Sequence, residues 1–318
     1  MSKPTIVQIG SLAGSPGANE VLRDKFNVIA LWESSNPAET LRQASEVEVV
    51  VTSAMYGCSA EIMKQLPKLK LISNWGVGYD TIDVEAARVR GIAVTNTPDV
   101  LNDCVADEAW GLLIASARHI AQGDQFVRAN RWENQDGMLP LGTRVSGKKL
   151  GIIGLGRIGL AIAKRGLGFD MQIAYHNRTA RTDVPYQYMQ KLTDLARWAD
   201  FLVVATVGGA TTRGLVSRDV LKALGPAGLI VNIARGPVID ETAMVELLQS
   251  GELGGAGLDV FENEPKVPDA LKRMPNVTLM PHVGSATTET RQAMFDLTLS
   301  NVEAYFAGKA LLTPVSTS

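Results

Sequence analysis

Short apolar runs that alternate with longer amphipathic stretches constrain the fold of this chain more than any other feature. The runs are rich in valine and isoleucine and are apolar on both faces, as strands buried on both sides of a parallel sheet are. A first set of five and a second set of six occupy residues 5–9, 28–31, 47–52, 69–73 and 92–95, then 149–153, 171–175, 201–205, 229–233, 256–260 and 277–280. Helical spacing between them, as in 60–66 and 241–248, predicts an α/β fold with two doubly wound parallel-sheet domains.

The boundary between the two domains is predicted near Asn96-Thr97-Pro98, which punctuates the end of the first set of strands. A long helix over 100–120 follows and could connect the domains. The last helix, over 288–306, is expected to end before Gly308 in a C-cap. We therefore assign residues 1–98 and 286–318 to one domain and 99–285 to the other.

Composition excludes several functional classes. The 318 residues are 46% hydrophobic and 20% charged with a net charge of −2, which suits two globular domains and argues against a nucleic-acid partner. The two cysteines, Cys58 and Cys104, lie far apart without metal-ligand spacing, so neither a metal site nor a disulfide framework is expected. The N-terminus does not resemble a signal peptide, and no apolar run is long enough to span a membrane. A cytoplasmic location is the simplest expectation.

A glycine loop opens the second set. Gly154, Gly156 and Gly159 form G-x-G-x-x-G between a predicted strand and a predicted helix, where the motif favours dinucleotide binding over a plain connecting turn. The pyrophosphate would bind the free amides at the helix N-terminus. Arg157 either contacts a phosphate or is an ordinary exposed arginine.

The end of the next strand indicates which dinucleotide is bound. An acid that binds the ribose 2′-hydroxyl is expected about 20 residues after the loop, but Asn177 stands there, followed by Arg178, Thr179 and Arg181. An arginine pair would attract a 2′-phosphate that an aspartate would repel. We therefore expect NADP(H) to be preferred and NAD(H) to be possible, although the arginines could simply be solvated on a surface turn.

Arg235, Glu264 and His282 follow later strands and are expected at the same edge of the sheet as the glycine loop. An arginine fork suits a substrate carboxylate, and a histidine beside a carboxylate stays protonated and serves as a general acid. Taken singly, the three residues could instead be a helix cap, a solvated acid and a core histidine. Together they predict reduction of a 2-oxo acid by a nicotinamide cofactor.

The chain resembles the D-isomer-specific 2-hydroxyacid dehydrogenase family. The motifs that carry the resemblance span roughly residues 70–290 in the family's order: NWGVGYDTID, NTPDVLNDCVADEA, GLGRIG, NIARGPVIDE, GLDVFENEP and PHVGSAT. The resemblance implies a Rossmann cofactor domain and a flavodoxin-like substrate domain with a cleft between them, and it implies that Arg235, Glu264 and His282 are catalytic. Glu264 argues against the formate dehydrogenase branch, which has glutamine there.

The resemblance also implies further binding residues. Trp75, Gly76, Val77 and Gly78 would bind the substrate carboxylate, and Asp259 would hold the nicotinamide amide. The resemblance implies further contacts to the cofactor from Ile158, Thr206, Val207, Ile233, His282 and Gly284. Asn177 departs from the NAD-type pattern, and at this position the chain resembles the members of the family that are NADPH-dependent glyoxylate and hydroxypyruvate reductases.

The substrate and the assembly stay less defined. Trp75 and Trp132 would narrow a pocket, so glyoxylate or hydroxypyruvate is preferred over a bulkier aromatic 2-oxo acid such as phenylpyruvate. The segment 136–141 is an apolar projection that in this family helps to form a homodimer, with Met138 and Leu139 as candidate contacts to the partner. A dinucleotide-sensing corepressor is the alternative from another class, disfavoured because no appended recruitment arm is evident.

Overall fold

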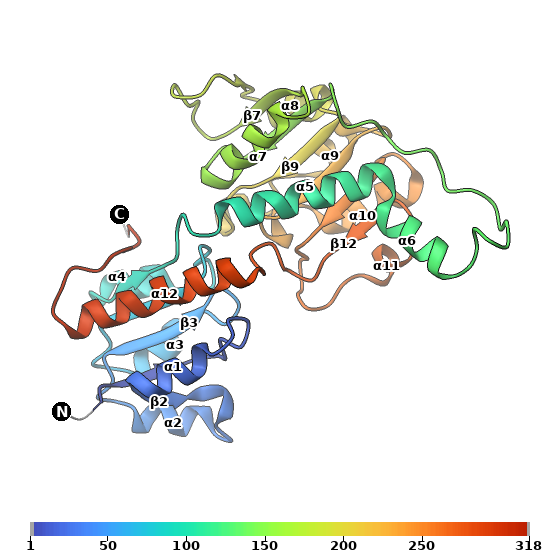
Figure 1. The fold of residues 1–318 in the computed structure, drawn as a ribbon. Helices are drawn as coiled ribbons and strands as arrows, with labels where there is room; N and C mark the ends of the chain where they lie inside the picture. The colour runs from blue at the N-terminus through green and yellow to red at the C-terminus, as the bar shows by residue number, and fades with distance from the viewer. Residues whose placement is uncertain (1–2, 317–318) are drawn as a thin grey trace. The chain divides into compact units, whose positions relative to one another are not determined.

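The structure is a computed structural model that describes residues 3–316; positions 1–2 and 317–318, at the ends of the first predicted domain, lie outside the described residues. The chain separates into two compact units, Met1–Leu101 with Ser285–Ser318, and Asn102–Gly284 (Figure 1). Both units are built on parallel sheets, as the strands that are apolar on both faces predict.

The first unit contains a five-stranded parallel sheet in the order β2-β1-β3-β4-β5. Its strands are β1 (Thr5–Gln8), β2 (Asn27–Ala30), β3 (Val49–Ser53), β4 (Leu71–Trp75) and β5 (Ala93–Thr95). Its helices are α1 (Ala18–Lys25), η1 (Leu31–Glu33), α2 (Pro37–Gln43), α3 (Ala60–Gln65), α4 (Val84–Val89) and α12 (Thr288–Phe306). The core joins β-strand residues such as Val50 and Ile72 to Leu41, Met63 and Ala87 of α2, α3 and α4. Helix α12 packs on β4, where the Ser73 hydroxyl donates to the Thr298 carbonyl at 3.1 Å.

The second unit contains a seven-stranded parallel sheet in the order β12-β11-β10-β9-β6-β7-β8. Its strands are β6 (Lys149–Ile153), β7 (Gln172–His176), β8 (Gln187–Tyr188), β9 (Phe201–Val204), β10 (Leu229–Asn232), β11 (Gly255–Leu258) and β12 (Val277–Leu279). Its helices are α5 (Asn102–Arg118), α6 (Ile120–Arg128), α7 (Arg157–Leu167), α8 (Leu192–Trp198), η2 (Ala210–Thr212), α9 (Arg218–Leu224), η3 (Gly236–Val238), α10 (Glu241–Ser250) and α11 (Asp269–Arg273).

Helices cover the second sheet and complete its core. Helix α5 crosses β10, β11 and β12, where the Ser116 hydroxyl donates to the Ala256 carbonyl at 3.3 Å (Figure 1). The Trp110 indole of α5 stacks on Phe169 at 4.6 Å and donates to the Ile162 carbonyl of α7 at 3.1 Å. Residues of α8, α9 and α10 form a second apolar layer with the strands. The sheet is therefore buried by helical residues, and its strand ends are left to carry polar groups.

Two local differences separate the structure from the sequence prediction. The helix expected over 100–120 ends at Arg118, because His119 adopts φ 54° in the left-handed region and the chain restarts as α6. The two-residue strand β8 has no counterpart among the predicted runs. Gly308 takes the position after the α12 C-cap with φ 65°, as predicted. Within residues 3–316, none of the helices combines the length and the hydropathy needed to cross a bilayer.

Candidate active site

One edge of the second sheet gathers the predicted catalytic and cofactor-binding residues of this unit. Because every strand pairs in parallel, the carboxyl ends of β6, β7, β9, β10, β11 and β12 lie along the same edge. The predicted residues at these ends are Gly154, Gly156, Arg157, Ile158 and Gly159 after β6, Asn177, Arg178, Thr179 and Arg181 after β7, Thr206 and Val207 after β9, Ile233 and Arg235 after β10, Asp259 and Glu264 after β11, and His282 and Gly284 after β12. The strand order also reverses between β9 and β6, which is where ligands bind in open α/β sheets.

His282 and Glu264 form a direct pair. The imidazole Nδ1 lies 2.7 Å from Glu264 Oε2, and the other carboxylate oxygen, Oε1, accepts the Phe261 amide at 3.0 Å. Both side chains stay accessible, with 38% of the His282 side chain and 31% of the Glu264 side chain exposed. Since Nδ1 is bound to the carboxylate, Nε2 is the ring nitrogen left for a substrate.

The charge state of Glu264 is set by opposing effects. Burial acts to raise the pKa of this carboxyl, but the hydrogen bond and charge of His282, with the Phe261 amide and the Arg235 guanidinium, hold the pKa below its ordinary value. Glu264 is therefore a carboxylate over the whole neutral range. The predicted general-acid pair is present as geometry, with the carboxylate ready to face a protonated imidazole.

Asp259 anchors the loop that carries His282. Asp259 is 2% exposed. Its carboxylate accepts hydrogen bonds from the amides of Val283 at 2.7 Å and Gly284 at 2.9 Å, and its backbone carbonyl accepts one from the His282 amide at 2.8 Å. Burial raises the pKa of Asp259, and the two amides oppose that rise. His282 itself sits at φ 55°, a strained region for a non-glycine residue that these bonds help to maintain. The contact to the nicotinamide stays a prediction, because the oxygens of Asp259 already serve the backbone.

Arg235 is brought close to the same loop by its neighbour Gly236. A Cβ atom at Gly236 would lie only 1.9 Å from the Phe261 carbonyl carbon, so the two backbone segments touch and a larger residue does not fit. The Arg235 backbone is fixed by Asn232, whose amide group donates to the Arg235 carbonyl at 3.0 Å. Arg235 is half-buried, and the charge of its guanidinium is one of those that lower the pKa of Glu264. The structure therefore brings the three predicted catalytic residues together.

The glycine loop fits a dinucleotide pyrophosphate. Gly154 has φ 93°, and a Cβ atom there would lie 2.7 Å from the Thr206 backbone. A Cβ atom at Gly159 would lie 2.2 Å from the Gly154 carbonyl oxygen, so helix and loop pack closely. At Gly156, by contrast, no heavy atom of the described chain outside Gly156 and its two chain neighbours lies within 4 Å of an added Cβ, which leaves open space at the start of α7. This is the cradle that a phosphate group would occupy. Arg157 and Ile158 lie in the first turn of α7.

The two arginines after β7 do not form the pair available to a phosphate that the sequence predicted. Arg178 and Thr179 are exposed, and in the described part of the chain Arg178 has no ion-pair or hydrogen-bond partner. The Arg181 guanidinium, however, is held by both Asp183 carboxylate oxygens and donates to the Leu155 carbonyl at 2.8 Å. Asn177 Oδ1 accepts the Leu155 amide at 2.7 Å. The sequence located these residues but missed Asp183 and the partners of Asn177 and Arg181.

In the first unit, the loop after β4 presents backbone amides. Asn74 donates to the carbonyls of Gly76 at 3.0 Å and Gly78 at 2.9 Å, and Asn96 donates to the Val77 carbonyl at 2.9 Å. Among the described residues, no acceptor is recorded for the amides of Gly76, Val77 and Gly78. Trp75 is 8% exposed. The sequence analysis assigned no role to the two asparagines, although each is the first residue of one of the quoted motifs, NWGVGYDTID and NTPDVLNDCVADEA.

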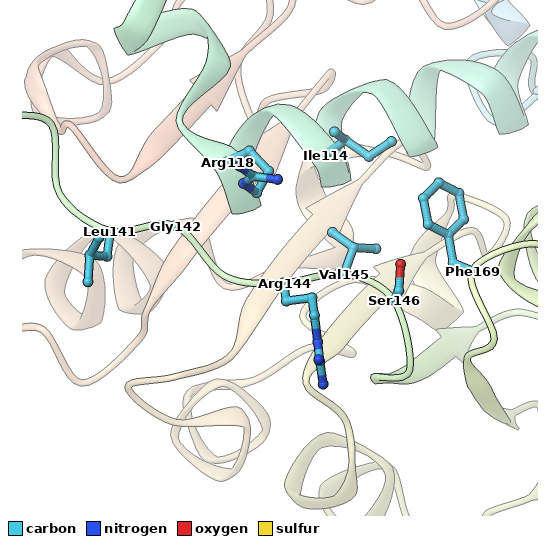
Figure 2. A pocket seen from close by; sticks show the side chains of 8 residues that line it. All are labelled: Ile114, Arg118, Leu141, Gly142, Arg144, Val145, Ser146 and Phe169. Atoms are coloured by element: carbon cyan, nitrogen blue, oxygen red, sulfur yellow. The ribbon is translucent and has the colours of Figure 1, made fainter.

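Three apolar side chains of the segment between α6 and β6 face solvent. Trp132, Met138 and Leu141 are 73%, 91% and 97% exposed, and the segment runs outside the body of this unit (Figure 1). Leu141 also borders a pocket of about 430 Å³ between the end of α5 and Phe169, and Arg144 in its wall points away from the helix (Figure 2). This pocket shares no residue with the predicted site.

The chain is similar to known proteins in sequence and in structure. Residues 110–284 match the family model described as "D-isomer specific 2-hydroxyacid dehydrogenase, NAD binding domain". The chain is 47% identical to a glyoxylate/hydroxypyruvate reductase A of Arabidopsis thaliana (92% of this chain, 94% of the relative) and 46% identical to a hydroxyphenylpyruvate reductase of Plectranthus scutellarioides (again 92% and 94%). Among solved structures, an NADPH-dependent glyoxylate/hydroxypyruvate reductase from Sinorhizobium meliloti in complex with NADP and malonate aligns with TM-score 0.91 at 42% identity, over 99% of this chain and 98% of that chain.

Proposed function

Since this chain belongs to the family of D-isomer-specific 2-hydroxyacid dehydrogenases, we propose that it reduces a small 2-oxo acid of the glyoxylate or hydroxypyruvate type to the D-2-hydroxy acid, with NADPH preferred over NADH. The observation that carries the proposal is the His282–Glu264 pair at 2.7 Å, held beside Arg235 at the strand ends that also carry the glycine loop. The names of the Arabidopsis and Sinorhizobium relatives support the substrate class and the cofactor.

Each side chain of the pair has a separate task in this reaction. A bound nicotinamide cofactor supplies the hydride. The free Nε2 of His282 donates the proton to the carbonyl oxygen of the substrate, and Glu264 stabilises the protonated imidazole and fixes its orientation through Nδ1. The Arg235 guanidinium binds the carboxylate of the substrate and polarises the 2-oxo carbonyl group that is reduced. Asp259 acts through the backbone of His282 and keeps the ring in place.

We assign further binding roles to backbone groups. The amides of Gly76, Val77 and Gly78 bind the substrate carboxylate, because Asn74 and Asn96 hold their carbonyls and leave the amides available. The amides at the start of α7 bind the pyrophosphate, for which Gly156 leaves room. Arg178 binds the 2′-phosphate of NADPH, because it is exposed after β7 and Asn177 brings no negative charge to that position.

An aromatic 2-oxo acid is the second candidate substrate, supported by the 46% identity to a hydroxyphenylpyruvate reductase. The test is kcat/KM for glyoxylate, hydroxypyruvate, phenylpyruvate and 4-hydroxyphenylpyruvate, each with NADPH and with NADH. The proposal expects the highest values for glyoxylate or hydroxypyruvate with NADPH. A preference for the aromatic acids would select the second candidate, and tight NADPH binding without turnover of any of the four acids would overturn both.

We also propose that two copies of the chain associate through the apolar segment 136–141, in which Met138, Leu139 and Leu141 are 91%, 37% and 97% exposed. Such exposed apolar side chains mark interaction surfaces in soluble proteins. Light scattering should give the mass of a dimer for the wild type and of a monomer for Met138→Asp combined with Leu141→Asp. A wild-type monomer at micromolar concentration would contradict the association.

A further inference from the structure

The loop after β7 is tied to the glycine loop through a single residue, Leu155. Asn177 Oδ1 accepts the Leu155 amide at 2.7 Å, and Arg181 Nη1 donates to the Leu155 carbonyl at 2.8 Å. Leu155 lies between Gly154 and Gly156 and is 1% exposed. Both backbone polar groups of this buried residue are therefore satisfied by side chains from the neighbouring loop, which fixes the backbone just before the open position at Gly156.

Arg181 is held in this position from several directions. Asp183 Oδ1 accepts a hydrogen bond from Arg181 Nε at 2.9 Å, and Asp183 Oδ2 accepts one from Arg181 Nη2, so the two side chains form a bidentate ion pair. The Arg181 amide donates to the Tyr175 hydroxyl at 2.7 Å, and Tyr175 is completely buried. The Asp183 side chain carries a full negative charge opposite the guanidinium, and its pKa is lowered by the hydrogen bond to Arg181. A phosphate would have to displace both Asp183 and the Leu155 carbonyl to engage this fork.

We infer that Arg181 is a positioning residue of the glycine loop and that, of the two arginines, only Arg178 distinguishes NADPH from NADH. The inference rests on the proposed use of a nicotinamide dinucleotide and deepens it. Arg181 acts through Leu155 on the part of the site that both cofactors share, the pyrophosphate cradle. Arg178 is exposed and has no partner within residues 3–316, so its guanidinium is available to the group that only NADPH has.

The test is the dissociation constant of each cofactor, measured by fluorescence titration or calorimetry without substrate. Arg181→Ala should weaken the binding of NADPH and NADH by the same factor, because the Leu155 carbonyl loses the hydrogen bond that fixes the loop; the expected loss is roughly tenfold, which corresponds to about 1.4 kcal/mol. Arg178→Ala, the matched control, should weaken NADPH by roughly tenfold or more and leave NADH within twofold, the loss expected for one charge-assisted contact. Loss of NADPH affinity alone in Arg181→Ala would overturn the inference.

A second variant keeps the inference testable if Arg181→Ala does not fold. Asp183→Asn removes the charge that competes for Arg181. If Arg181 bound the 2′-phosphate, this substitution would tighten NADPH selectively; as a positioning residue, Arg181 should leave the ratio of the two dissociation constants within twofold of the wild type. Selective tightening would therefore contradict our assignment. These outcomes need no turnover, so an absence of 2-oxo acid reduction would defeat the proposed reaction while leaving the binding result to stand.

Discussion

Two glycines of the cofactor loop should separate folding from binding. At Gly159 an added Cβ atom would lie 2.2 Å from the Gly154 carbonyl oxygen, well inside van der Waals contact, so α7 must move away from the loop. Forcing a methyl group into a packed region costs about 1–3 kcal/mol. At Gly156 the same atom meets no described heavy atom within 4 Å apart from those of Gly156 and its two chain neighbours, and alanine can adopt the backbone conformation at φ −83°. The two substitutions add the same group three positions apart with opposite structural consequences.

Gly159→Ala should lower the melting temperature by roughly 3–10 °C, the shift that about 1–3 kcal/mol produces in a unit of this size. Gly156→Ala should melt within about 2 °C of the wild type, because a weaker N-cap and a less flexible unfolded chain offset each other. Its NADPH affinity should nevertheless fall roughly tenfold to a hundredfold. The added methyl group displaces the pyrophosphate from the helix amides, and one charge-assisted hydrogen bond is worth about 1.5–3 kcal/mol.

The assays are a thermal melt followed by circular dichroism and a fluorescence titration with NADPH, made on the same preparations. Wild-type affinity in Gly156→Ala would refute the argument that the open space beside Gly156 holds a phosphate. A wild-type melting temperature in Gly159→Ala would show that the helix and loop tolerate the contact, and the packing argument would be wrong.

Three further substitutions and one reagent test other links. His282→Ala should reduce kcat about a hundredfold or more and leave the NADPH dissociation constant unchanged; an unaltered rate would remove His282 as the acid. Burial acts to raise the pKa of Glu264 and His282 acts to lower it, and the lowering dominates, so Glu264 is a carboxylate that favours the protonated imidazole. Glu264→Gln removes that negative charge, and the fall of the reduction rate at alkaline pH should therefore move to lower pH. A pH profile of kcat/KM that does not move would contradict the role of the pair. Asn177→Asp should keep the bond to the Leu155 amide and shift preference from NADPH toward NADH, checked by the ratio of kcat/KM values; an unchanged ratio would deny any influence of charge at this position. Burial raises the pKa of the Cys58 thiol to about 12, so a disulfide reagent near pH 8 should modify at most one of the two cysteines before unfolding; two fast thiols in the folded protein would contradict that burial.

The regular elements were predictable because each is encoded locally. The strand Lys149–Ile153 and the helix Thr288–Phe306 coincide with their predicted ranges, because an apolar run between polar turns limits the strand and a Thr287 N-cap and Gly308 limit the helix. Parallel sheets followed from runs that are apolar on both faces. The break at His119 had no such signal, because a single left-handed residue between two helical patterns leaves the periodicity on either side intact.

The sequence predicted which residues form the candidate site and which strand ends carry them, but not the contacts that hold them. Strand ends located Arg235, Glu264 and His282, because all parallel strands deliver their carboxyl ends to one edge. The hydrogen bonds that hold them were not predictable: no local pattern indicates that Asp259 would accept the amides of Val283 and Gly284. Such partners depend on how loops from different strands meet, which is a property of the whole sheet.

At position 177, after β7, an asparagine in place of the expected acid could change two properties of the side chain. An acid in the place of Asn177 would bring an oxygen that accepts a hydrogen bond and a negative charge that repels a 2′-phosphate. The Asn177 carboxamide retains the first, since its Oδ1 accepts the Leu155 amide at 2.7 Å, and lacks the second. The sequence revealed only the missing charge, and the arginines nearby then looked like a pair that replaces it. The geometry divides them, because Arg181 completes the hold on Leu155 and is neutralised by Asp183, whereas Arg178 stays exposed. If NADPH is the cofactor, as proposed, its preference over NADH would depend on one arginine and on the absence of one charge, and the other polar groups of the loop would hold the backbone beside the glycine loop.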